Sequence, residues 1–220
     1  MFAGDNGAEE FSTYASGKPE TIQVARTGMS EAFAEALIGR HVGAQIIFGT
    51  PDSSGSIIAE YVVTQFMAVT VTAAQTVPLR AEGSAVAPVK GLPVVTLAAT
   101  GEPAVALPES QPPSYLVAQP LIRGGGPAIA LDQSVLVHYS LWNWDGAELL
   151  DTTWATGVAT TWRMSTGRTL QGLVQGLVGQ PVGSQILLVI PPELGFGDSD
   201  TLGIPGGSTL VYVVDVLYAS

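Results

Sequence analysis

The chain has 220 residues, of which 46% are hydrophobic and 12% charged, so it can bury the core of one large domain or two small ones. Its formal net charge of −11 repels phosphate backbones and anionic lipids, and nucleic acid is therefore not an expected partner. Because the chain has no cysteine, disulfides, thiolate catalysis and zinc–thiolate sites are excluded, and cysteine usage gives no information about the compartment.

The chain starts with MFAGDNGAEE, a polar, glycine-rich stretch that does not resemble a signal peptide. The apolar stretches further along fall far short of the roughly 20 residues that cross a bilayer, so we expect no membrane span in this chain. The residues after this start read like the middle of a domain. We therefore expect that an N-terminal part is missing before Met1, and a naturally short start is the alternative.

An internal repeat connects the two halves of the chain. The segment FAEALIGRHVGAQIIFGTP, from Phe33, aligns without gaps with LVQGLVGQPVGSQILLVIP, from Leu173, at a shift of 140 residues. The same shift aligns TYASG at residues 13–17 with TWATG at residues 153–157. Only the second copy has a full set of strands ahead of it. We therefore predict a truncated, degenerate copy at residues 1–77 and a complete domain at residues 113–220.

The connector between the copies, residues 78–112, is rich in Ala, Pro and Val. Two interpretations of it remain open. It is either a flexible linker, or a segment whose short extended runs PVVTL and PAVAL pack partly on a domain.

In the second half, two periodicities alternate along the chain. Strands are expected at residues 115–122, 135–139, 186–190 and 210–217, where apolar and β-branched residues cluster or alternate. Between them, Leu170, Leu173, Val174 and Leu177 share one face of a helix that Gly179 ends. One short helix among strands predicts an α+β domain in which an antiparallel sheet wraps around the helix.

The segment ILLVIPPELGFGD shows how one of these strands ends. Pro191 and Pro192 cannot donate to a β-ladder, so the strand leaves the sheet there and enters a loop. In that loop, Gly195 and Gly197 give the backbone freedom on either side of Phe196. This arrangement predicts a loop that directs one aromatic ring at a pocket.

Five motifs of the second half follow one another in an order that is typical of one protein family. They are VHYS, DGAELLDTTW, LQGLVQGLVGQPVGSQ, IPPELGFG and IPGGSTLVYVVDVL. Over residues 113–220 this series resembles the FKBP-type peptidyl-prolyl isomerases, the macrolide-binding immunophilins. The tandem arrangement with its long connector looks most like extracytoplasmic actinobacterial members, so the resemblance implies a location outside the cytoplasm or in the cell envelope.

The resemblance implies an isomerase that assists the folding of proline-containing chains by binding the X-Pro bond in a dry apolar pocket. Its partners would be proline-containing peptides or unfolded proteins, and it would bind macrolides weakly. It would need no cofactor and no metal. The alternative is a non-catalytic binding or chaperone module whose pocket has drifted. An all-β adhesion sandwich is disfavoured by the helix at residues 170–177.

The resemblance also implies roles for individual residues. Tyr139 would donate its hydroxyl, Asp151 would polarise or orient the twisted carbonyl, and Phe196 would cover the pocket. The substrate-binding wall would consist of Leu150, Trp162, Thr169, Leu170, Leu173, Ile204 and Tyr212. At three positions this chain departs from the family: Leu173 replaces the usual tryptophan floor, Leu150 a phenylalanine, and Phe196 a tyrosine.

The remaining candidates receive structural interpretations. His138 should point away from Tyr139 on its strand, and we assign no role to Trp142, Trp144 or Trp154. Asp198 and Asp200 belong to a solvated loop that lacks the oxygens a calcium site needs. In the first copy, Phe11 or a deletion stands where the second has Asp151, which predicts that the first copy is inactive.

Overall fold

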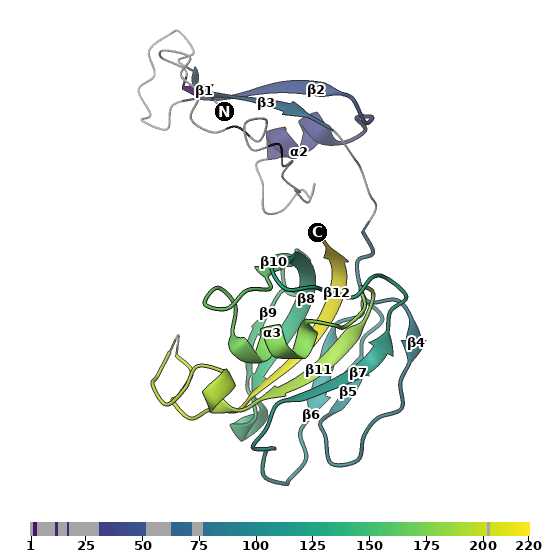
Figure 1. Ribbon diagram of the computed structural model, residues 1–220, viewed down its shortest axis with the longest axis vertical. Helices are drawn as coiled ribbons and strands as arrows, with labels where there is room; N and C mark the ends of the chain where they lie inside the picture. Colours follow the sequence, from purple (N-terminus) through teal and green to yellow (C-terminus); the bar gives the residue numbers. More distant parts are fainter. Residues whose placement is uncertain are drawn as a thin grey trace. The chain divides into compact units, whose positions relative to one another are not determined.

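The computed structural model describes residues 2–3, 12, 17, 31–51, 63–71, 77–201 and 203–220 (Figure 1). The chain forms two compact units, Met1–Thr76 and Val77–Ser220. Phe11 and residues 13–16, which carry part of the predicted repeat, lie outside the described residues.

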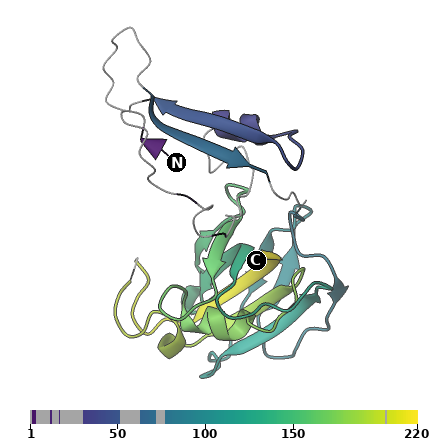
Figure 2. The ribbon, with the colours of Figure 1, turned by 45° about the horizontal axis from the view of Figure 1, so that its top comes forward.

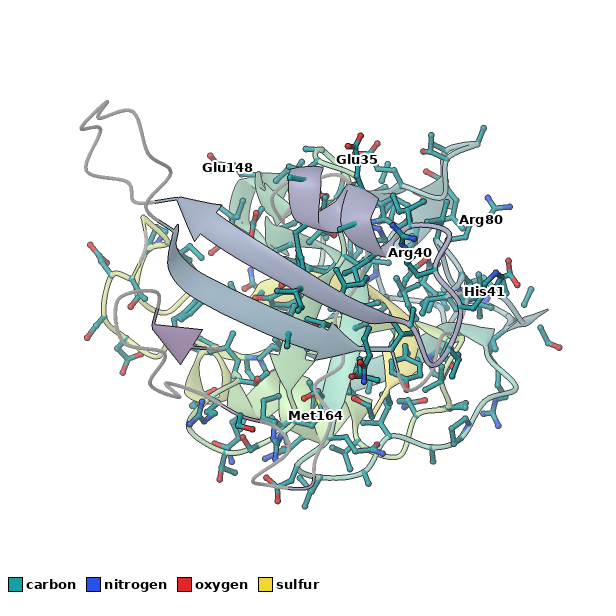
Figure 3. All side chains as sticks on the ribbon, turned by 90° about the horizontal axis from the view of Figure 1, so that it is seen from above. Glu35, Arg40, His41, Arg80, Glu148 and Met164 are labelled. Atoms are coloured by element: carbon teal, nitrogen blue, oxygen red, sulfur yellow. The ribbon has the colours of Figure 1, made fainter. Side chains whose placement is uncertain are left out.

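The described part of the first unit contains one helix and a small antiparallel sheet. The sheet has the order β1-β3-β2, and its elements are β1 (Phe2–Ala3), α2 (Glu31–Leu37), β2 (Gln45–Pro51) and β3 (Val63–Thr70). Ala34 and Leu37 form the buried side of the helix. Glu35 lies on the helix, and just beyond its end Arg40 donates from Nε to the Ala36 carbonyl at 3.1 Å (Figure 3).

The second unit is built on a seven-stranded sheet whose strand pairs are all antiparallel. Its order is β10-β8-β12-β11-β7-β4, and β9 also pairs with β8. The strands are β4 (Ser84–Ala85), β7 (Val117–Arg123), β8 (Ser134–Asn143), β9 (Leu149–Thr152), β10 (Thr160–Arg163), β11 (Gln185–Ile190) and β12 (Leu210–Ala219). Short 3-10 turns follow β8 and β11, namely η1 (Asp145–Ala147) and η2 (Pro192–Leu194).

One α-helix, α3 (Gln171–Leu177), packs on the sheet face that we call the inner face (Figures 1 and 2). It approaches β11 closely, because a Cβ added to Gly172 would lie 2.4 Å from Cγ2 of Ile190. The helix ends before Gly179, whose φ of +88° suits glycine. The predicted fold, an antiparallel sheet wrapped around one short helix, is therefore confirmed for the C-terminal half.

Alternation along the strands sends side chains to two different cores. On β12, Leu210, Tyr212 and Val214 face the inner core with the helix, whereas Val211 and Val213 face the opposite, outer core. Every residue of β11 is buried. A strand that is buried on both sides requires a cover on each face of the sheet.

The cover of the outer face comes from the segment that the sequence analysis treats as a connector. Its hairpin consists of β5 (Val94–Leu97) and β6 (Pro103–Ala106), drawn fainter behind the sheet in Figure 1. Val95 and Val105 pack on a buried cluster formed by Trp142, Trp144, Leu187, Val189, Val211 and Val213. Of the two interpretations of residues 78–112, the packed one holds, and the segment belongs to the same compact unit as the rest of the domain.

Candidate functional site

Three aromatic rings meet on the inner face of the sheet. Tyr139 comes from β8, Trp162 from β10 and Tyr212 from β12. The Tyr139 ring centroid lies 4.9 Å from that of Trp162 and 5.9 Å from that of Tyr212, and Trp162 meets Tyr212 edge to face at 6.3 Å. These distances fall in the range of favourable aromatic pairs, so the rings form one continuous apolar wall.

Asp151 lies at the exposed edge of this wall, on β9, and accepts a hydrogen bond from the Tyr139 hydroxyl. The chain on either side of both residues is fixed by further bonds. The Tyr139 amide donates to Oγ1 of Thr153 at 2.9 Å, and the Thr153 amide donates to the Tyr139 carbonyl at 3.0 Å. The hydroxyl and the carboxylate are therefore held together by the pairing of β8 with the residues that end β9.

The other predicted site residues surround the same core. Leu173 and Ile204 are buried within it, and Leu150, Leu170 and Phe196 are half-buried against it. Thr169 does not join this cluster; its hydroxyl donates to the carbonyl of Arg163 at 2.7 Å, next to Trp162. Met164, labelled in Figure 3, is fully buried in the inner core. Apart from Thr169, the structure thus gathers the predicted site residues on one face of the sheet, and their roles remain predictions.

The loop that carries Phe196 turns tightly around Pro192. The amides of Gly195 and Gly197 both donate to the Pro192 carbonyl at 2.9 Å. Gly197 has a φ of +74°, a left-handed conformation that strains other residues. This turn places the half-buried Phe196 ring against the inner core, which agrees with the prediction of a loop that directs an aromatic ring inward.

Both tyrosines of the site keep their protons more firmly than free tyrosine does. Burial raises the pKa of Tyr139, and the hydrogen bond to Asp151 and the charge of Asp151 raise it further. Burial also raises the pKa of Tyr212, with smaller effects from Tyr139 and Asp151. The phenols therefore stay neutral across the physiological pH range. What they offer to a ligand is apolar surface and a hydroxyl rather than a base.

On the outer face, behind the site, His138 points away from Tyr139 as predicted. It is buried, and its ring stacks on Trp154 with centroids 4.5 Å apart. Its Nδ1 lies 2.9 Å from Oγ1 of Thr153, and burial lowers the pKa of His138. The sequence analysis assigns no role to Trp154. In the structure its ring stacks on His138, which contacts Thr153 two residues after Asp151.

A cavity of about 430 Å³ lies away from the aromatic wall, and Arg80, Glu82, Gly101, Gln185 and Asp215 are among the residues that line it.

Within the described ranges, no three His, Asp or Glu side chains are grouped as a metal site requires. The carboxylate of Asp200 instead accepts a hydrogen bond from the Gly206 amide at 2.9 Å. No helix in the described part of the chain is long and apolar enough to cross a membrane.

Residues 126–217 match the sequence profile of the FKBP-type peptidyl-prolyl cis-trans isomerases. The chain is 32% identical over 118 residues to the FK506-binding protein of Streptomyces anulatus, covering 53% of this chain and 95% of that protein. It is 29% identical over 118 residues to the probable FK506-binding protein of Corynebacterium glutamicum, covering 54% of this chain and 98% of the relative.

Longer relatives match over a smaller share of their length. The chain is 36% identical over 102 residues to the FKBP-type peptidyl-prolyl cis-trans isomerase FkpA of Escherichia coli, covering 46% of this chain but 37% of that protein. The crystal structure of FkpA from Escherichia coli matches with a TM-score of 0.45 and 32% identity, over 60% of this chain and 53% of the other. With nearly the whole Streptomyces relative covered at this level of identity, the chain belongs to the family of FKBP-type peptidyl-prolyl cis-trans isomerases.

Proposed function

We propose that the second unit catalyses the cis/trans isomerisation of X-Pro bonds in proline-containing peptides and unfolded proteins. The observation that carries this proposal is the wall of Tyr139, Trp162 and Tyr212 with the Tyr139–Asp151 hydrogen bond at its exposed edge. A proline ring is apolar and has no N–H group, so an aromatic wall can receive it without leaving a donor unpaired.

The physical basis of the catalysis is a change of surroundings for the amide. Rotation about an X-Pro bond faces a barrier of about 18–20 kcal/mol and takes tens to hundreds of seconds without a catalyst. The planar amide is more charge-separated than the twisted one, and water stabilises it. Moving the bond into an apolar site therefore favours the twisted form, and each 1.36 kcal/mol gained lowers the barrier enough for about a tenfold rate increase.

Each site residue has a place in this proposal. Tyr139 lines the pocket and donates its hydroxyl hydrogen to Asp151, Asp151 polarises or orients the twisted carbonyl, and Phe196 covers the bound proline. The walls and floor consist of Leu150, Trp162, Thr169, Leu170, Leu173, Ile204 and Tyr212. Because burial keeps both tyrosines protonated, the proposed mechanism moves no proton.

The proposal is tested by replacing Asp151. Asp151→Ala is expected to lower turnover of a proline peptide by about tenfold or more without unfolding the domain, because a positioned polar group is lost at the reacting bond. The measurement is cis/trans exchange by NMR on an Ala-Leu-Pro-Phe type peptide. The control is Asp145→Ala, the same change at an exposed aspartate of η1.

The outcomes separate the two candidate functions. Unchanged turnover in Asp151→Ala would remove Asp151 from the mechanism. If the folded parent chain gives no acceleration at all, the site is a non-catalytic binding module instead. Leu173 and Leu150, which replace the family's usual tryptophan and phenylalanine, and the degenerate first copy are the features that favour this second candidate.

Macrolide binding gives a separate prediction about Phe196. We expect weak binding, because the loop position that usually carries a tyrosine hydroxyl here has a phenylalanine. Phe196→Tyr is expected to tighten macrolide binding by roughly two- to tenfold, the value of one hydrogen bond of about 0.5–1.5 kcal/mol. Calorimetric titration of both proteins measures the change, and equal affinities would show that the ring at residue 196 does not reach the ligand.

For the first unit we propose a degenerate, non-catalytic copy of the same architecture. Its helix α2 and strand β2 begin 140 residues before α3 and β11. Its sheet order β1-β3-β2 parallels β8-β12-β11. At the position that corresponds to Tyr212, the first unit has Met67. The connection from β2 to β3 is also shorter: the paired residues Gln45 and Thr70 are five residues closer in the sequence than the paired residues Gln185 and Asp215. We therefore expect the first unit to contribute no isomerase activity. Any turnover that remains in Asp151→Ala would then come from the second unit.

A further inference from the structure

We propose that the β5–β6 hairpin on the outer face positions the catalytic carboxylate, with Trp154 as the positioning residue that joins the hairpin turn at Gly101 to the segment carrying Asp151. This inference rests on the proposed function, because it assigns Asp151 to the isomerase site. It gives the connector a part in the site, although none of residues 78–112 belongs to the inner core cluster.

The segment from Asp151 to Trp154 passes from the inner to the outer face of the sheet. Asp151 bonds to the Tyr139 hydroxyl, whereas Thr153 bonds through Oγ1 to His138 at 2.9 Å. The Trp154 amide in turn donates to Oγ1 of Thr152 at 3.2 Å. Movement at Trp154 is therefore passed through a short, hydrogen-bonded segment to Asp151.

The Trp154 ring is held by packing on two sides. It stacks on His138 with an interplanar angle of 25°. The hairpin turn also packs against the ring, because a Cβ added to Gly101 would lie 3.2 Å from Cη2 of Trp154 and 3.0 Å from Cδ of Arg80. Among the described residues, the buried Nε1 of Trp154 has no hydrogen-bond partner. Packing rather than hydrogen bonding of the indole therefore sets the position of the ring.

The turn of the β5–β6 hairpin is itself attached to the sheet. The Gly101 amide donates to the Ala98 carbonyl at 2.9 Å, and Nη1 of Arg80 donates to the Ala99 carbonyl at 3.3 Å. Arg80, labelled in Figure 3, precedes Ala81, whose amide donates to Asp215 on β12 at 2.8 Å. The turn is therefore tied to the sheet that carries Tyr139 and Tyr212, and it acts as a fixed support for Trp154.

The test compares two glycines of the same segment. Gly101 and Gly91 have φ values of +99° and +89°, so alanine strains the backbone at both. Only at Gly101 would the new Cβ meet Trp154 and Arg80; at Gly91 it meets nothing within 4 Å. The pair separates the effect of contact with Trp154 from the effect of backbone strain.

Gly101→Ala is expected to lower kcat for the proline peptide by about three- to tenfold with little change in KM, because small displacements of a positioned group slow turnover. It should also shift the 13Cζ signal of Tyr139, which reports the hydrogen bond to Asp151. Gly91→Ala should leave both readouts as in the parent chain. Equal effects of the two substitutions, or an unshifted Tyr139 signal in Gly101→Ala, would overturn the proposal.

Substitutions at Trp154 give a second, independent comparison. Trp154→Leu removes the stack on His138 and should lower kcat by about tenfold, whereas Trp154→Phe keeps a flat ring there and should recover part of it. Equal kcat values in these two folded variants would also count against the proposal. If the parent chain shows no turnover, the proposed function fails, but the Tyr139 signal in Gly101→Ala still decides whether the hairpin controls the Tyr139–Asp151 pair.

Discussion

A chain that begins at residue 113 is expected to lose cooperative folding, whereas a chain that begins at Val77 should fold as the second unit does here. Removing residues 77–112 exposes six side chains, each at most 6% exposed in the structure: Trp142, Trp144, Leu187, Val189, Val211 and Val213. Burial of one such side chain is worth about 1.5–3 kcal/mol, so losing much of this burial would consume most of a typical stability of about 5–15 kcal/mol.

Thermal unfolding by circular dichroism and binding of a hydrophobic dye measure this difference. A sharper form uses one strand of the hairpin, where Val95 packs on the outer core and Val94 is 58% exposed. Val95→Asp should destabilise the unit because it places a charge against apolar side chains, and Val94→Asp should not. A chain starting at residue 113 with the melting temperature of the longer one would show that the hairpin is not part of the folding unit.

Much of the second unit could be predicted because its periodicities are local. The strand ending at Pro191, the helix at residues 170–177 and the exit at Gly179 follow from side-chain spacing and from the conformations of proline and glycine. The hairpin could not be placed in this way, because its short runs do not specify what they pack on. One signal was available: the unbroken apolar run at residues 186–190 is typical of a strand covered on both faces.

The candidate site divides in the same manner. Tyr139, Asp151 and Phe196 were identified through motifs whose order resembles a family, and the structure brings them to one face. Trp154 was missed because its partner Gly101 lies more than fifty residues earlier, and no local pattern reports such a contact. A carboxylate within the apolar run of β12, Asp215, was an unused signal of a specific buried partner.

Asp215, on β12, is a buried carboxylate that ties the start of the connector to the sheet. It is 2% exposed, and its two carboxylate oxygens accept hydrogen bonds from the Ala81 amide at 2.8 Å and from Nε2 of Gln185 at 2.7 Å. Asp215→Ala leaves both donors buried without an acceptor, at a cost of about 1–3 kcal/mol each. Chemical denaturation should therefore show a loss of several kcal/mol, with release of the start of the connector from the sheet.

Asp215→Asn is the matched control, because an amide keeps an acceptor for Ala81, and Gln185 can turn its own amide to pair with it. It also removes the charge. Burial raises the pKa of the Asp215 carboxyl, and this effect outweighs the opposing effects of the Ala81 amide, Gln185 and Arg80. The folded chain therefore binds the proton more tightly than the unfolded chain, so ionisation of Asp215 reduces stability.

The sign of the pH dependence follows from this. The free energy of unfolding of the parent chain, relative to Asp215→Asn, should fall as the pH rises from about 4 through the raised pKa and then level off. His138, the cross-strand neighbour of Asp215, is present in both proteins, so its own titration largely cancels in the difference. A relative stability that rises with pH would mean that the hydrogen bonds and Arg80 hold the carboxylate ionised, so that the charge itself fastens the connector to the sheet.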